Sequence, residues 1–225
     1  MTKKIINICF ITLELIIYIL FLFFSKGKIT AYLQYSSLIL LFIWLIIVSK
    51  KDIDSYVVLF AFIFTLIADF FLVICNDHYH LALVFFNIVQ IAYAFRIYSI
   101  KQNKKTFLLY ITLALVLLIT AKIITKSKFD LLVFLTMVYF ANLLTNFYLT
   151  FFLKPKNWLF TFGLLFFIFC DVIVGFYSFS AYIEVTQDSL IYFIAHNPIN
   201  LAWLMYLPSQ ILIGFSVKQK GLLYN

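Results

Sequence analysis

Long apolar runs separated by short polar breaks make up most of the chain. A membrane-spanning helix needs roughly 20 predominantly apolar residues, so each run between two breaks predicts one span. Eight spans are predicted, at residues 5–24, 31–49, 55–75, 81–99, 107–124, 131–153, 158–178 and 199–217. Asn197 and Pro198 interrupt the stretch from Leu190 to Asn200, which is either a longer start to the last span or a short interfacial segment. The loops are too short to hold a soluble domain, so residues 1–225 are expected to form a single transmembrane domain.

The runs favour helices over the strands of a membrane barrel. Barrel strands alternate lipid-facing and lumen-facing residues over about 10 positions, and no such alternation occurs here. Composition agrees with this prediction, because 65% of the residues are hydrophobic and only 12% are charged, against about 25% charged in soluble proteins. The predicted fold class is therefore all-α, a polytopic membrane helical bundle.

The basic residues predict how the spans are oriented. The side that holds both termini carries most of them: Lys3, Lys4, Lys50, Lys51, Arg96, Lys101, Lys104, Lys105, Lys154, Lys156, Lys218 and Lys220. The opposite side has Lys26, Lys28, Lys122, Lys126 and Lys128. Because short cytoplasmic loops carry the excess of Lys and Arg, both termini are expected in the cytoplasm.

The net charge of +8 is explained by this topology and by contact with an anionic bilayer, so no nucleic-acid partner is expected. Lysine outnumbers arginine 16 to 1 and Phe, Ile, Tyr and Asn are abundant. This bias suggests an AT-rich bacterial genome, and hence a bacterial cytoplasmic membrane.

Three acidic residues lie inside predicted spans: Glu14, Asp69 and Asp171. A charged side chain near the bilayer centre costs roughly 2.5–3.5 kcal/mol on insertion scales, so such residues mark functional sites by default. Asp69 and Asp171 share a Phe-x4-Asp pattern with a small residue, Ala68 or Cys170, before the acid. The alternative for each acid is a structural hydrogen bond that fixes helix packing.

Asp69 and Asp171 are predicted to lie at one depth. Asp69 is about 21 Å along its span and Asp171 about 20 Å along its own, and both spans run outward from the cytoplasm. Matched acids four spans apart suggest a site between two four-helix halves. Two carboxyl groups together in a low-dielectric site do not both ionise cheaply, so one is expected to hold a proton. That arrangement suits general acid catalysis and equally suits proton-coupled transport.

Other polar residues fall at mid-span and are predicted to line the same cavity. Asn87, Gln90 and Tyr93 share one helical face, as do Asn142 and Asn146. The last span adds Tyr206, Ser209 and Gln210. For the amides, the alternative is hydrogen bonding that holds neighbouring helices together.

These motifs resemble the lysoplasmalogenase family of eight-span, YhhN-like membrane proteins. The resemblance runs from about Val57 to Val217 and rests on the two aspartate motifs, on Gln90-Ile-Ala-Tyr93 and on the closing LAWLMYLPSQILIGFSV. Ala68, Cys170 and Gln90 stand where the family usually has Gly, Ser and His. The resemblance implies hydrolysis of the vinyl ether bond of a lysoplasmalogen, which gives a fatty aldehyde and a glycerophospho-headgroup. Asp69 and Asp171 would then be catalytic.

In this interpretation the substrate is a lysophospholipid taken from the bilayer. The residues expected to bind it are Asn87, Gln90, Tyr93, Asn142, Tyr206, Gln210 and Glu14. No cofactor or metal is expected, since GxSxG, HExxH and phosphate-binding glycine loops do not occur. Two alternatives stay open: a proton- or cation-coupled small transporter, and a lipid-binding membrane protein without catalysis.

Overall fold

The structure, a computed structural model, describes residues 3–23, 27–50, 52–98, 104–153, 156–179, 182, 186–197 and 199–217. The longer helices are α1 (Lys3–Phe23), α2 (Lys28–Val48), α3 (Ile53–Asp69), α4 (Tyr79–Tyr98), α5 (Lys104–Thr125), α6 (Leu131–Thr150), α7 (Trp158–Phe179) and α9 (Leu201–Ser216). Three short ones complete the order: the π-helical η1 (Phe70–Cys75), the 3-10 helix η2 (Lys126–Lys128) and α8 (Leu190–His196). The described residues form no strand, and the all-α prediction is confirmed.

Seven of the described helices are long and apolar enough to cross a membrane. They correspond to the first seven predicted spans. The eighth is shorter than predicted, because α9 has 16 residues and extends for about 24 Å, less than the roughly 30 Å of a hydrocarbon core. The residues before it form α8, a separate helix of 7 residues. The number of spans is thus confirmed for seven helices and not for the eighth.

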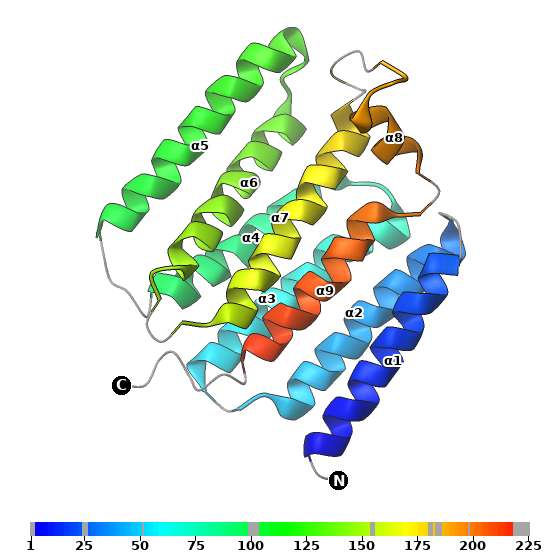
Figure 1. Ribbon diagram of the computed structural model, residues 1–225. Helices are drawn as coiled ribbons and strands as arrows, with labels where there is room; N and C mark the ends of the chain where they lie inside the picture. Colours follow the sequence, from blue (N-terminus) through cyan, green and yellow to red (C-terminus); the bar gives the residue numbers. More distant parts are fainter. Residues whose placement is uncertain are drawn as a thin grey trace.

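Six of the described helices close a ring in which each packs against the next, in the order α2, α3, α4, α6, α7 and α9, with α9 returning to α2. Figure 1 shows α3 and α4 behind α6, α7 and α9. α1 begins and α9 ends at one end of the bundle, here called the terminal end; α3 ends and α9 begins at the opposite, distal end (Figure 1). Each predicted half therefore supplies three helices to the ring.

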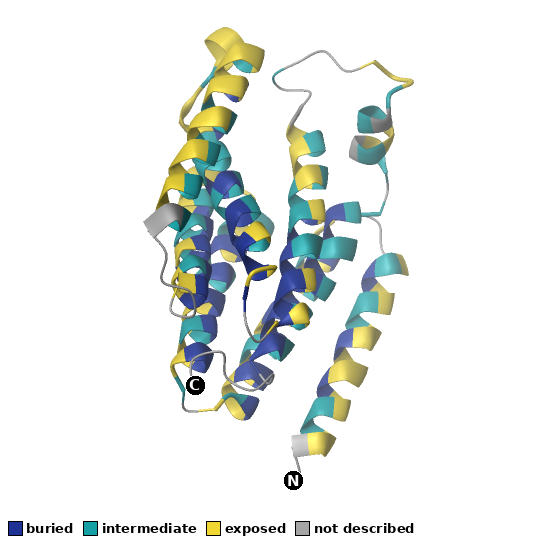
Figure 2. Cartoon of the chain, turned by 60° about the vertical axis from the view of Figure 1, so that its left-hand side comes forward, coloured by how far each residue is buried: buried dark blue, intermediate teal, exposed yellow. Residues whose placement is uncertain are grey.

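The remaining helices of each half, α1 and α5, lie outside the ring against α2 and α6. Both present apolar side chains outward: Ile8 and Leu15 of α1 are 55% exposed, and Phe107 of α5 is 70% exposed. Figure 2 shows the same division, with buried residues in the interior of the bundle and exposed ones on the outer faces. Exposed apolar helix faces of this kind fit a lipid surrounding, so the chain is a multi-pass membrane protein.

Polar side chains define where several helices begin. Asp52 accepts a hydrogen bond of 2.8 Å from the Ser55 amide at the start of α3. Asp130 accepts one of 2.8 Å from the Val133 amide at the start of α6. Such N-caps satisfy amides that have no partner inside the helix. They fix the starts of these helices where the polar breaks of the sequence predicted them.

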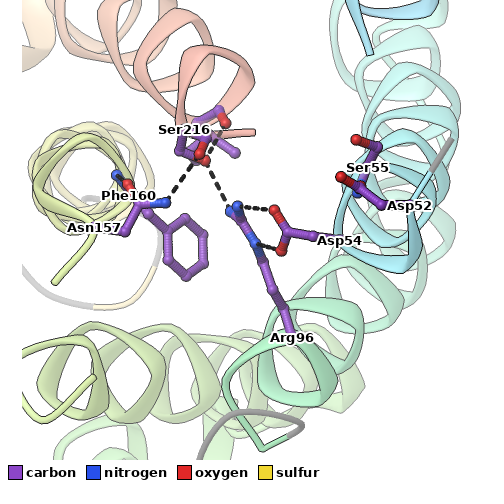
Figure 3. A network of polar contacts seen from close by, with 8 residues as sticks. Asp52, Asp54, Ser55, Arg96, Asn157, Phe160 and Ser216 are labelled. Carbon is purple, nitrogen blue, oxygen red and sulfur yellow. Dashed lines mark hydrogen bonds and ion pairs between the residues drawn. The ribbon is translucent and has the colours of Figure 1, made fainter. Parts of the chain in front are cut away.

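A buried ion pair joins the ring helices at the terminal end (Figure 3). The Arg96 guanidinium of α4 donates to both carboxylate oxygens of Asp54 on α3, at 2.6 and 2.7 Å. It also donates to the Ser216 hydroxyl of α9 at 2.8 Å and lies 4.4 Å from the centre of the Phe160 ring of α7. Arg96 is 1% exposed and Asp54 2%. One guanidinium group therefore contacts helices from both halves.

Arg96 was assigned above to the basic rim of the cytoplasmic side, and the structure corrects that assignment. The side chain is turned into the bundle because Asp54 neutralises its charge there, and the bidentate geometry satisfies the donors that burial removes from water. Lys50, which belongs to the same predicted rim, is exposed.

Removing Arg96 is expected to destabilise the bundle strongly. Arg96→Met leaves the Asp54 carboxylate buried without its partner, which typically costs about 3–5 kcal/mol. The double variant Asp54→Leu, Arg96→Met removes both charges and is expected to recover much of this loss. Thermal unfolding in detergent measures the effect, with Lys50→Met as the exposed-charge control. A single variant as stable as the parent would contradict this role.

The contact between α7 and α9 depends on Gly163. A Cβ atom at this position would lie 2.6 Å from Cγ1 of Ile213 and 3.2 Å from the Ser209 carbonyl oxygen. Gly163→Ala is therefore expected to destabilise the protein by about 1–3 kcal/mol. Gly175→Ala on the same helix is the matched control, because its Cβ would meet nothing within 4 Å. The control is expected to be neutral or slightly stabilising, since Ala is the better helix former. Equal unfolding temperatures for the two variants would refute the close packing.

Candidate functional site

Asp69 lies at the distal end of the ring interior. It is the last residue of α3 and is 3% exposed. Its Oδ2 accepts a hydrogen bond of 2.5 Å from the Tyr206 hydroxyl of α9. Since α3 and α9 are not adjacent in the ring, this hydrogen bond crosses the interior. Tyr206, which was predicted to bind substrate, is thus hydrogen-bonded to Asp69, one of the two predicted catalytic acids.

Asp171 has a corresponding tyrosine partner. It lies on α7 and is partly exposed, and its Oδ2 accepts a hydrogen bond of 2.6 Å from the Tyr139 hydroxyl of the neighbouring helix α6. Tyr139 itself is buried. Sequence analysis did not single out Tyr139, although it lies one turn before Asn142 on the face of α6 that was predicted to be polar. That spacing was the signal available for it.

The two aspartate–tyrosine pairs form one cluster. The carboxyl groups of Asp69 and Asp171 are close enough to interact electrostatically, and so are Tyr139 and Asp69. The Phe167 ring lies between the pairs, with its centre 5.4 Å from that of Tyr206 and 6.3 Å from that of Tyr139. The structure thus brings together the two acids that matched depth alone had placed at one level.

A change of helix type follows directly after Asp69. Residues Phe70–Cys75 form the π-helical segment η1, which ends at Asn76 in the left-handed conformation with φ of 50°. Such segments occur frequently at functional sites, because they alter the direction of the side chains on either side. The spans had been expected to continue without interruption here, since no Gly or Pro occurs in this segment.

The predicted amides of α4 and α6 form a second cluster. Gln90 Oε1 accepts a hydrogen bond of 2.9 Å from Asn146, and Asn87 Oδ1 accepts one of 3.4 Å from Asn142. The Tyr110 hydroxyl of α5 donates to Asn146 Oδ1 at 2.6 Å. These contacts tie α4, α5 and α6 together, so a packing role for the four amides is visible alongside any role in binding.

Two predicted residues, Tyr93 and Gln210, are fully buried in the ring helices and keep their polar groups unpaired. The Tyr93 hydroxyl and both polar atoms of the Gln210 amide make no hydrogen bond within the part of the chain described. Gln210 lies one helical turn from Tyr206 on α9. Buried polar groups are nearly always hydrogen-bonded, so those without a protein partner are available to a water molecule or a ligand.

Glu14 does not join the acid cluster. It is buried on α1, outside the ring, and accepts a hydrogen bond from the Ser37 hydroxyl of α2. The contact holds α1 against α2. Of the three acids predicted inside spans, two therefore lie together in the ring and the third lies at a peripheral helix contact.

A large cleft opens on the outer face of the bundle between α4, α5 and α6. Its volume is about 750 Å³. Gln90 and Asn142 line it together with mostly apolar residues: Ile91, Ala94, Phe95, Ile97, Tyr98, Thr106, Phe107, Tyr110 and Leu149. Asn142 is one helical turn from Tyr139, the partner of Asp171, so the cleft lies on the side of the ring that carries one of the acids.

No group of three or more His, Cys, Asp or Glu side chains in the described residues is arranged to hold a metal ion. The site defined by the geometry is a pair of carboxyls with two tyrosine donors. Asp54 and Arg96 were missed as interior residues by sequence analysis. The available signal was Arg96 itself, an arginine three residues before the end of a predicted span.

The fold and this cluster define a multi-pass, all-α membrane protein with a buried and a partly exposed acid clustered between its helices. Comparison with protein families gives a match to the model of the YhhN family over residues 29–217. Searches of curated proteins and of solved structures gave no match. The match covers more than four-fifths of the chain, so the chain belongs to the YhhN family, the family of lysoplasmalogenases. It also begins near the start of α2, earlier than the motifs that carried the resemblance.

Proposed function

We propose that this protein is a lysoplasmalogenase that hydrolyses the vinyl ether bond of a lysophospholipid within the membrane. The observation that carries the proposal is the pairing of Asp69 and Asp171 inside the ring, each hydrogen-bonded to a tyrosine hydroxyl, in a chain of this family. The products are a long-chain aldehyde and a glycerophospho-headgroup with a free hydroxyl on C1.

The first step is the transfer of a proton from a carboxylic acid to a carbon atom of the substrate. One of the two carboxyl groups holds a proton and delivers it to the outer carbon of the C=C–O unit. The electron pair of the double bond forms the new C–H bond, and the positive charge develops on the carbon attached to oxygen. This is the oxocarbenium-like state that paired carboxyls stabilise in glycoside hydrolysis.

The second carboxyl then acts on water. As a carboxylate it stabilises the developing positive charge, and it accepts a proton from the water that attacks the cationic carbon. The resulting hemiacetal breaks its bond to the glycerol oxygen, which takes the proton from the second carboxyl and leaves as an alcohol. The hemiacetal hydroxyl gives its proton to the first carboxylate as the aldehyde C=O forms. The reaction consumes one water molecule and regenerates both carboxyls.

The tyrosines and amides have supporting roles in this proposal. Tyr206 and Tyr139 orient the two carboxyls through their hydroxyl groups. Gln210 and Tyr93 offer unpaired polar atoms that can hold water in the ring interior. Gln90 is held by Asn146 and keeps one unpaired amide nitrogen, so it is a further candidate to orient water or substrate.

The hydrocarbon chain of the substrate needs an apolar surface that is continuous with the lipid. The cleft between α4, α5 and α6 offers one, with a volume of about 750 Å³, which is within the usual range for a ligand site. Asn142 and Tyr139 connect this cleft to the acid pair along one face of α6. We expect the alkenyl chain to lie there.

Replacing either aspartate is expected to abolish hydrolysis. Asp69→Asn and Asp171→Asn keep the size of the side chain but remove the acid, and loss of a general acid or base typically costs 10²–10⁴-fold in rate. The measurement is aldehyde release from an alkenyl lysophospholipid by the purified protein, followed by mass spectrometry. Glu14→Gln is the matched control, since it changes a buried in-span acid outside the ring and is expected to retain activity.

The same preparations separate the other functions. Folded parent protein that releases no aldehyde, but moves protons or a cation across liposomes, would favour a transporter. Intact lysophospholipid that copurifies without product would favour a lipid-binding protein. Full activity in a folded Asp69→Asn, Asp171→Asn double variant would refute the paired-acid mechanism.

Filling the cleft between α4, α5 and α6 is expected to make the enzyme prefer substrates with a shorter hydrocarbon chain. Ala94 lines the cleft and is partly buried, and Ala94→Trp places a large ring where the chain is expected to lie. The variant should lose kcat/KM on a substrate with a 16-carbon chain by about tenfold more than on an 8-carbon one, equivalent to roughly 1.4 kcal/mol of differential binding. An equal loss on both would argue against a chain in this cleft.

A further inference from the structure

A small polar pocket opens at the distal end of the bundle, separate from the large cleft. Its volume is about 170 Å³. It lies where the start of α2, the π-helical segment η1 and the start of α9 come together, and its lining includes Gln34, Leu72, Val73, Asn200 and Trp203. None of these elements lines the cleft between α4, α5 and α6.

Two unpaired polar atoms belong to this pocket. Gln34 is 3% exposed and its amide nitrogen, Nε2, has no hydrogen-bond partner among the described residues. The side-chain oxygen of Asn200, Oδ1, is also buried without a partner there. Among the described residues, the pocket thus presents an unpaired donor and an unpaired acceptor, and those that line it include no charged side chain. A hydroxyl group both donates and accepts, so an alcohol satisfies both atoms while an ion does not.

Two side chains, Trp203 and Tyr206, connect the pocket to Asp69. The Trp203 ring that lines it lies 4.9 Å from the ring of Tyr206, centre to centre, and Tyr206 donates to Asp69. Leu72 and Val73 follow Asp69 by three and four residues. Asp69 is therefore the acid that these contacts connect to the pocket.

We propose that this pocket binds the free hydroxyl group on the glycerol of a lysolipid, with Gln34 donating to it and Asn200 accepting from it. The inference rests on the proposed function and deepens it, because the vinyl ether oxygen is on C1 of glycerol and the free hydroxyl is on the adjacent C2. A diradyl lipid carries an acyl ester on C2 instead. It would leave Asn200 without a donor and would not fit the pocket, so the pocket selects lysolipids.

A pair of substrates tests the assignment. One is an alkenyl lysophospholipid with the C2 hydroxyl, and the other is its 2-deoxy analogue. The parent is expected to prefer the hydroxylated substrate by at least tenfold in kcat/KM, because a site built to hydrogen-bond a hydroxyl rejects the analogue without one. Gln34→Met keeps the length of the side chain and removes the amide, so this preference should fall to about twofold or less.

The controls separate recognition from folding. Ser36→Ala alters an exposed residue on α2 two positions away, whose hydroxyl only bonds the Leu33 carbonyl oxygen, and should keep the full preference. A purely structural effect of Gln34→Met would lower kcat/KM equally on both substrates and leave the preference for the hydroxylated one unchanged. If that variant does not fold, Asn200→Leu tests the acceptor, since the Asn200 side chain makes no cap bond to α9.

Binding without turnover distinguishes failure of this inference from failure of the proposed function. A 1-O-alkyl lysophospholipid has a saturated ether and is not cleaved, and its dissociation constant should rise about tenfold in Gln34→Met while that of its 2-deoxy analogue does not change. If binding of the 1-O-alkyl lysophospholipid depends on Gln34 but the protein releases no aldehyde, the assignment of the pocket is supported and the hydrolase function is rejected. If the parent releases aldehyde and Gln34→Met keeps the full preference for the C2 hydroxyl, the assignment of the pocket is rejected and the hydrolase function is not. Competition by free glycerol at the lysolipid concentration would assign the pocket to a free polyol and also overturn the inference.

Discussion

The bidentate ion pair between Arg96 and Asp54 is the contact on which the ring most depends. In a bundle surrounded by hydrocarbon, each charge must find its counter-charge inside the protein, because water is not available at the outer faces. Arg96 satisfies this condition with groups from α3, α9 and α7 at once. Those helices are far apart in the sequence, so the pair fixes which of them lie next to one another at the terminal end.

The same constraint operates differently at the distal end. Within the part of the chain described, Asp69 and Asp171 form no ion pair, and each accepts a hydrogen bond from a tyrosine. A neutral donor holds a carboxyl in place without committing it to the charged form. Among the described residues, the interior therefore has one end where an acid is matched by arginine and another where two acids are matched by tyrosine hydroxyl groups, and on our proposal the second end is the reactive one. A group that must gain and lose a proton needs the second kind of environment.

The two openings on the bundle suit the two parts of a lysolipid. The cleft between α4, α5 and α6 is mostly apolar, and the small distal pocket is lined by amides and the π-helical segment. The acid pair has a link to each, through Tyr139 and α6 in one case and through Tyr206 and Trp203 in the other. On our proposals, the chain and the glycerol hydroxyl are held on separate elements, and the ring fixes the scissile bond between them.

Much of the architecture could be predicted from the order of residues. Runs of about 20 apolar residues are required by the thickness of the bilayer, so seven helices and their ends could be located, and the cost of burying a carboxyl identified Asp69 and Asp171. The last helix was harder, because the interruption at Asn197 and Pro198 left open whether residues 190–200 extend the last span or form a separate segment, and hydropathy gives no sign that α9 has only 16 residues. The family could also be predicted from the sequence motifs, and the match to the family model over residues 29–217 confirms it.

Hydropathy has no information on which neighbour a buried polar group meets, and only the tertiary structure decided that. Arg96 looks like a cytoplasmic rim charge until α3 brings Asp54 to it, and Glu14 looks like a third site acid until α1 is seen to pack outside the ring. Tyr139 and Gln34 drew no attention, because a tyrosine or an amide in a span is ordinary until its partner or its lack of one is known. The sequence by itself determined the helices, their apolar faces and the two acids, since these follow from local composition and bilayer thickness. Packing between helices decided the pairing of those acids with tyrosines and the two openings, because both depend on residues brought together from distant parts of the chain.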